Sequence, residues 1–148
     1  MVLALAPTAY ATRAAQADRY RAGAELVERE GIEAYVEAVN AEPVPDILSR
    51  FAASYRFSPA VSEHLFPAAL RGAAASDLPA EDVVGAITAP ALLLAWDTDP
   101  GHPVSTAERL VALLPNAELH VAHRLRDVGT WTDRVESFLG SVAPAGVL

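Results

Sequence analysis

The sequence contains no cysteine, which excludes disulfide bonds, thiolate catalysis and cysteine-based metal sites. Basic residues are also scarce: 11 arginines and no lysine stand against 19 aspartates and glutamates, and the net charge is −8. This balance repels phosphate backbones and anionic membrane surfaces, and the sequence has no basic run with interleaved aromatic residues. We therefore expect no nucleic-acid partner and no membrane partner.

Long apolar runs are missing as well. The two most apolar segments, residues 1–11 and 86–96, are well short of the roughly 20 residues that a membrane-spanning helix requires. Aromatic residues make up only 7% of the chain, so the 52% hydrophobic content comes largely from alanine, leucine and valine. Over 148 residues this is the composition of one ordinary globular domain. We predict a cytoplasmic protein.

The stretch Ile87–Pro103 organises the rest of the chain. Its apolar run, Ala91–Trp96, is followed by acidic, glycine and proline residues, which is typical of a buried parallel strand that ends in a functional loop. Val2–Ala6 and Glu118–Ala122 have the length and composition of two further strands. A helix over Ser105–Leu114, opened by a capping box, would complete a βαβ unit. The sequence therefore predicts an α/β fold with a short parallel sheet of about three strands.

Most of the first half of the chain is rich in alanine and has apolar spacings near three and four, which favours helices. We predict a helical insertion over residues 8–74, with Thr8 as a helix N-cap and Gly31 as a C-cap. Its helices are expected at residues 8–30, 32–41, 46–55 and 60–74. The C-terminal unit, residues 87–139, should end in a helix that begins near Thr130 and stops at Gly140.

Ligands of open parallel sheets bind at the carboxyl ends of the strands, so the loop after Trp96 is the first place to look for chemistry. Asp97 or Asp99 could orient an imidazole in a nucleophilic triad; alternatively, one caps a turn and the other is solvated. With His102 they could also be drawn as ligands of a hard metal ion, but no further ligand or supporting shell lies nearby in the sequence. We predict neither a metal site nor a cofactor.

Among the four histidines, His123 is the candidate general base. It directly follows the predicted strand 118–122, in a loop adjacent to the one that carries the two aspartates. The alternative is a loop histidine among neighbouring arginines. His64, His102 and His120 fit a helix surface, a turn and the polar face of an edge strand, respectively.

Several of these elements together resemble the C-terminal half of an α/β-hydrolase. They are Pro90 before the strand, Asp99 with Pro103 four residues later, the run Leu113-Leu-Pro-Asn-Ala-x-Leu119, and Phe138-Leu139. The resemblance implies that Asp99 is the acid of a Ser-His-Asp triad and His123 its base. It also implies that residues 8–74 form the lid that many members insert, and that Val2–Ala6 is the strand before the lid.

The chain departs from the family pattern in three ways. Trp96 stands where the family usually has glycine before the acid loop. His123 follows its strand after a shorter loop than usual, without a glycine before it. No serine in the chain has glycines two positions to either side, so the Gly-x-Ser-x-Gly nucleophile elbow is missing.

We therefore predict a truncated or partial hydrolase that, when complete, acts on an ester-like or other acyl substrate, and whose nucleophile lies outside this chain. The expected substrate is small and apolar or acyl. Because a sheet of three strands leaves Val2–Ala6 with an open edge, we also expect a homo-oligomer or pairing with another chain there. The alternative is a non-catalytic domain that binds a small ligand or a protein partner on the same scaffold.

Overall fold

The computed structural model describes residues 1–44, 54, 56–99 and 101–143. These residues divide into two compact units. One unit is formed by residues 1–8 together with the chain from residue 79 onward, and it contains the sheet. The other spans residues 9–78 and is helical. The sheet unit is therefore assembled from two segments that are distant in the sequence.

The sheet has three parallel strands, β1 (Val2–Ala4), β2 (Ala91–Trp96) and β3 (Ala117–Ala122), in the order β1-β2-β3. β2 is the central strand, and its last residue, Trp96, lies opposite Ala122, the last residue of β3. The predicted fold class, an α/β fold with a short parallel sheet, is confirmed. Because all three strands run the same way, their carboxyl ends meet at one edge of the sheet.

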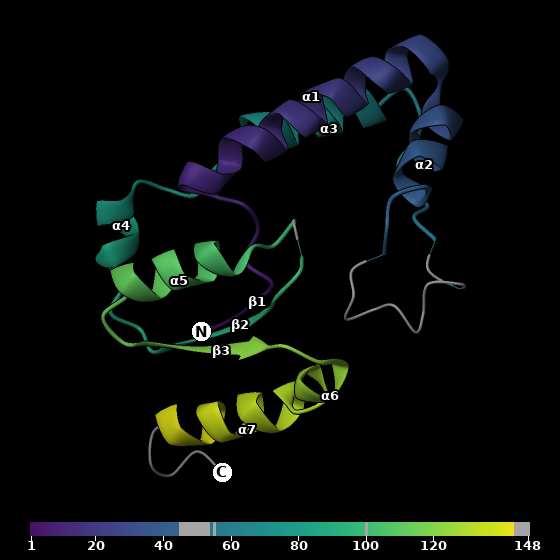
Figure 1. The fold of residues 1–148 in the computed structure, drawn as a ribbon. Coiled ribbons are helices and arrows are strands. Elements are labelled where there is room, and N and C mark those ends of the chain that lie inside the picture. The colour runs from purple at the N-terminus through teal and green to yellow at the C-terminus, as the bar shows by residue number, and fades with distance from the viewer. Residues whose placement is uncertain (45–53, 55, 100, 144–148) are drawn as a thin grey trace. The chain divides into compact units, whose positions relative to one another are not determined.

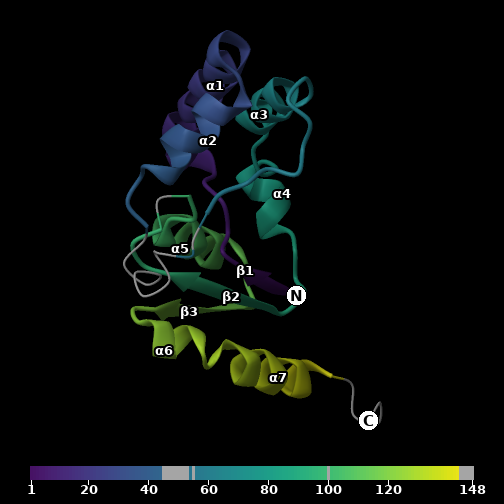
Figure 2. The same ribbon diagram turned by 90° about the vertical axis from the view of Figure 1, so that its right-hand side faces the viewer.

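Helices cover both faces of this sheet (Figures 1 and 2). α5 (Val104–Leu113) contacts β2 and β3 on one face, with the short α4 (Glu81–Gly85) beside it. α7 (Trp131–Val142) lies on the other face, preceded by α6 (Leu125–Val128). The first five residues of β2 are buried, which explains why the strand reads as a continuous apolar run rather than an alternating one.

The side chains of β2 alternate between the two faces. Leu92 and Leu94 pack with Phe138 of α7, and Val2, Trp131 and Val135 adjoin this cluster. Leu93, which points to the opposite face, is only 1% exposed. Both faces of the central strand are thus held by apolar packing.

The first strand is shorter than the predicted Val2–Ala6. Leu5 has a φ of 58°, a left-handed conformation that a non-glycine residue rarely adopts and that ends the strand after Ala4. The Leu5 amide still donates to the carbonyl of Leu94 (2.8 Å). The chain therefore leaves the sheet within one residue of the last strand pair.

The helical unit consists of a 3₁₀ turn (Tyr10–Thr12), α1 (Arg13–Glu30), α2 (Ile32–Asn40) and α3 (Phe66–Ala75). Its core is formed by Ala24, Val27, Phe66 and Leu70. Tyr35 meets the ring of Phe66 edge to face, with 5.2 Å between the ring centroids, and it meets Phe57 in the same way at 6.0 Å. Gly31, with a φ of 91°, ends α1 as predicted, and its amide donates to Val27.

Several predicted helix boundaries were wrong. Thr8 is not the N-cap of α1, because the 3₁₀ turn comes first and the Thr12 hydroxyl accepts the Ala9 amide instead (3.0 Å). The capping box predicted at Ser105 is absent, since α5 already begins at Val104 behind Pro103. The last predicted helix of the insertion begins at Phe66 rather than residue 60, and α7 continues past Gly140. The helix predicted over residues 46–55 lies almost entirely outside the described residues.

Two glycines inside helices of this unit allow a paired test of its packing. A Cβ on Gly23 of α1 would lie 2.6 Å from Cε2 of Tyr35, whose ring is held by two aromatic neighbours, whereas a Cβ on Gly72 of α3 would meet nothing within 4 Å. Alanine gains about 1 kcal/mol over glycine in a helix, but overpacking costs about 1–3 kcal/mol. We expect Gly23→Ala to lower the free energy of unfolding by about 1 kcal/mol and Gly72→Ala to raise it by up to about 1 kcal/mol. Urea unfolding followed by circular dichroism measures both, and equal effects of the two substitutions would contradict the packing described here.

Candidate active site

Two residues that directly follow neighbouring strands face each other at the carboxyl edge of the sheet. Asp97 follows β2, and its amide donates to the carbonyl of Ala122 (3.1 Å), so the pairing of β2 with β3 extends one residue beyond the strands. His123 follows β3, and its Nδ1 lies 2.6 Å from Oδ2 of Asp97. The side chain of His123 is 68% exposed and that of Asp97 is 40% exposed. The strand register thus produces a histidine–carboxylate pair open to solvent.

The second aspartate of the loop, Asp99, contacts a different histidine, His102. Oδ2 of Asp99 lies 2.9 Å from Nδ1 of His102, and Oδ1 accepts the amides of Gly101 (2.9 Å) and His102 (3.2 Å). The Asp99 side chain is only 13% exposed, and that of His102 is 40% exposed. The loop therefore holds a second histidine–carboxylate pair.

The backbone conformation of Thr98 explains why Asp97 and Asp99 contact different histidines. Its φ of 68° is left-handed, which is unusual for any residue except glycine and especially so for a β-branched one. In an extended loop Asp97 and Asp99 would point in similar directions, as the sequence suggested. The left-handed turn between them instead gives each its own partner.

The two residues predicted to form the site, Asp99 and His123, both lie at this edge, but each contacts a different residue. His123 contacts Asp97, and Asp99 contacts His102. The catalytic roles of Asp99 and His123 stay predictions. The sequence did carry a signal for the observed pair: in parallel strands that end in register, the two residues that follow them stand side by side.

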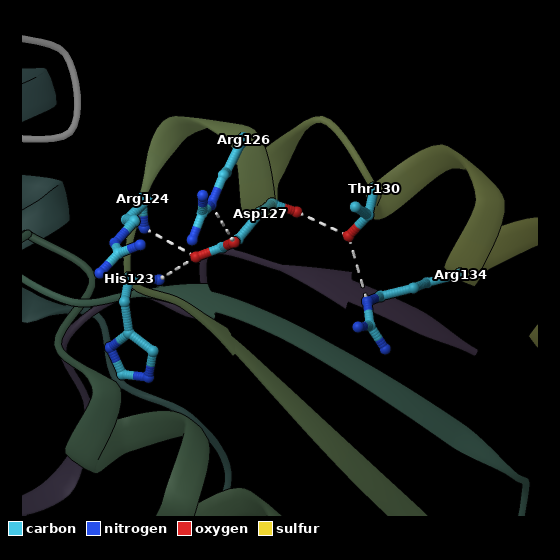
Figure 3. A network of polar contacts seen from close by, with 6 residues as sticks. All are labelled: His123, Arg124, Arg126, Asp127, Thr130 and Arg134. Carbon is cyan, nitrogen blue, oxygen red and sulfur yellow. Dashed lines mark hydrogen bonds and ion pairs between the residues drawn. The ribbon is translucent and has the colours of Figure 1, made fainter.

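Asp127 fixes the backbone at His123 (Figure 3). Its Oδ2 accepts the amides of His123 (3.1 Å) and Arg124 (2.9 Å), which closes the turn that leads into α6. Burial alone would raise the pKa of the Asp127 carboxyl, but the two amides and the charges of Arg126 and Arg124 lower it overall. Asp127 therefore stays ionised and holds the turn, a role that the sequence analysis did not assign.

Trp96 stands where the α/β-hydrolases that the sequence resembles usually have a glycine. Its ring stacks on that of Trp131 at the start of α7. The ring centroids are 6.1 Å apart and the planes are inclined by 23°. Both indole nitrogens are buried without a hydrogen-bond partner among the described residues. The tryptophan thus fills the corner between β2 and the start of α7.

The described residues contain no group of three or more histidine, aspartate or glutamate side chains that could hold a metal ion. The residues considered as metal ligands from the sequence were Asp97, Asp99 and His102. The turn at Thr98 separates them, so that Asp97 contacts His123 while Asp99 contacts His102. His64 is exposed in the helical unit. None of the described helices is both long enough and apolar enough to span a membrane.

Comparison with known proteins supports the fold. No known family model and no curated protein sequence matches the chain. Among solved structures, the chain is similar to MenH from S. aureus, with a TM-score of 0.64 and 21% sequence identity. It is also similar to a thermophilic esterase from Thermogutta terrifontis, solved with malate bound, with a TM-score of 0.62 and 18% sequence identity. The chain thus has part of an α/β-hydrolase fold, as the sequence resemblance predicted.

The similarity covers almost all of this chain but only part of its structural neighbours. It spans 95% of this chain and 59% of MenH, and 97% of this chain and 56% of the esterase. The chain therefore spans less than two thirds of the length of either neighbour. At these identities the likeness concerns the fold, and the chemistry has to be argued from the residues of the site.

His120, on β3, allows a test of the electrostatics of the sheet unit. Burial lowers the pKa of His120, the charges of Arg134 and His123 lower it further, and Asp127 opposes them. Its Nε2 is buried without a partner among the described residues. The folded chain therefore binds a proton at His120 less readily than the unfolded chain, in which the usual histidine pKa is about 6.5.

We expect the free energy of unfolding to decrease as the pH falls from 7.5 to 5.5, and to decrease less in His120→Gln, which has no proton to gain. Urea unfolding at the two pH values measures this. His64→Gln is the matched control, because it removes an exposed histidine of the helical unit and should keep the pH dependence of the unmodified chain. An unchanged pH dependence in His120→Gln would show that this histidine is not the cause.

Proposed function

We propose that the chain provides the acid–base half of an acyl hydrolase, with His123 as the general base and Asp97 as the carboxylate that orients it. The observation that carries this proposal is the 2.6 Å contact between Nδ1 of His123 and Oδ2 of Asp97 at the carboxyl edge of the sheet. The family resemblance pointed to the same histidine and to Asp99 as its acid. We favour Asp97 because it is the carboxylate that His123 contacts.

The chemistry follows from the two nitrogens of the imidazole. With Nδ1–H donated to Asp97, the Nε2 of His123 carries a lone pair that can accept the proton of a hydroxyl nucleophile. The carboxylate then stabilises the imidazolium that forms, and the same Nε2 returns the proton to the leaving group. Asp127 keeps the base in place through the amides of His123 and Arg124.

The nucleophile is proposed to come from sequence outside these 148 residues, since the chain has no Gly-x-Ser-x-Gly. The open edge of β1 offers a place for a further strand. The Met1 carbonyl accepts from Leu92 and the Leu5 amide donates to Leu94, so backbone groups of the odd-numbered residues face β2. Those of Val2 and Ala4 then point to the other edge, where no described strand lies. We further propose that the helical segment acts as a lid over an apolar, ester-like or other acyl substrate.

The lack of a nucleophile elbow favours a second candidate, a non-catalytic domain that binds a small ligand or a partner on this scaffold. In that case the two histidine–carboxylate pairs would be ligand contacts or turn-forming residues, and their replacement would not change any hydrolytic rate. The two candidates therefore differ in a single measurable quantity.

The test uses protein purified from its native source through an affinity tag, so that any associated segment stays with the chain. We expect hydrolysis of p-nitrophenyl butyrate with a burst of product, and loss of that activity after treatment with an organophosphate that phosphorylates activated serines. His123→Gln should reduce the organophosphate-sensitive rate by about 10²-fold or more, because general base catalysis contributes about 10²–10⁴-fold. Asp97→Asn should reduce it as well, by removing the group that orients the base.

His64→Gln is the control, since it replaces a histidine outside both pairs. Asp99→Asn distinguishes the two candidate acids: a loss as large as that of Asp97→Asn would return the role of the acid to Asp99. If the native preparation has no organophosphate-sensitive activity, or if His123→Gln retains all of it, the hydrolase proposal is wrong and the binding role stands.

A further inference from the structure

The Asp99–His102 pair is held more firmly by its surroundings than the Asp97–His123 pair. Three hydrogen bonds converge on the Asp99 carboxylate, two from backbone amides and one from the imidazole. Its side chain is 13% exposed, compared with 40% for Asp97. A carboxylate held by backbone amides in a largely buried position keeps its orientation without help from substrate.

The backbone around this pair is built to match. A Cβ on Gly101 would lie 3.3 Å from Oδ1 of Asp99, so the close approach of the Gly101 amide is best served by glycine. The Gly101 carbonyl accepts the amide of Thr8 (3.2 Å), a buried residue that follows β1. The left-handed turn at Thr98 completes the arrangement at a cost of about 1–3 kcal/mol, which the surrounding contacts must offset.

The imidazole of His102 is partly exposed to solvent. Its Nδ1 is engaged by Asp99, while its Nε2 has no hydrogen-bond partner among the described residues, and the side chain is 40% exposed. This is the arrangement of a general base: one ring nitrogen is oriented by a carboxylate and the other is available for a proton.

From this geometry we infer a second activity: His102, positioned by Asp99, activates water for direct hydrolysis of activated esters, without a serine nucleophile. Nε2 of His102 takes a proton from water as the water oxygen bonds to the acyl carbon and the carbonyl electron pair moves to oxygen. Collapse of this intermediate breaks the bond to the alcohol oxygen, and the imidazolium returns its proton to the departing oxygen or to solvent. Ester and water become acid and alcohol.

This inference shares its edge of the sheet with the proposed function but rests on a different pair, and the two can fail separately. The organophosphate-sensitive rate reports the serine-dependent reaction. The rate that survives organophosphate treatment reports water attack, which needs no acyl-enzyme and should therefore show no burst.

The experiment measures hydrolysis of p-nitrophenyl acetate by the organophosphate-treated native protein. We expect a residual rate above the buffer background that is slower in D₂O. His102→Gln should lower it by at least about 10-fold, in line with the usual contribution of a general base. Asp99→Asn should lower its kcat with little change in KM, because an amide does not stabilise the imidazolium that forms as water attacks.

His64→Gln is the matched control and should leave the residual rate unchanged. Circular dichroism of each variant separates loss of the base from loss of the fold. A residual rate that persists in folded His102→Gln, or no residual rate in the treated protein, would overturn the inference. A normal residual rate in protein that lacks any organophosphate-sensitive component would overturn the serine-dependent proposal alone.

Discussion

The structure of the sheet unit depends on the pairing of β2 with a strand on each of its edges. β2 is a short apolar strand whose two faces are covered by α5 and α7, and its first five residues are buried. The residues that follow it are the first backbone released from this constraint. The parallel pairing with β3 continues to Asp97, which is why a residue just after β2 meets one just after β3.

The left-handed residue Thr98 adds a second constraint at the same point. One residue in this conformation costs about 1–3 kcal/mol, an amount that a loop retains only when its neighbours over-determine it. Here the neighbours on either side do so, because Asp97 is held by His123 and by the carbonyl of Ala122, and Asp99 by His102 and two amides. The strain and the two pairs are therefore parts of one arrangement.

The sequence predicted the central strand well because β2 is apolar on both faces and bounded by Pro90 and a polar loop, signals that come from the residues themselves. It predicted the pairing within the site less well. The direction of Asp99 is set by a single φ angle at Thr98, and nothing in the composition of Asp-Thr-Asp favours that angle. The predicted start of α1 was wrong for a similar local reason, because a 3₁₀ turn takes the place of the expected N-cap.

The two histidine–carboxylate pairs are formed within the sheet unit. The hydrogen bonds described for the two pairs join residues of the sheet unit: Asp97, His123 and Asp127 for one pair, and Asp99, Gly101 and His102 for the other. The nucleophile of the proposed serine-dependent reaction would have to reach the carboxyl edge of the sheet to meet the imidazole of His123. A further parallel strand paired with the edge of β1 where no described strand lies would also end at that edge, with β1 between it and β2.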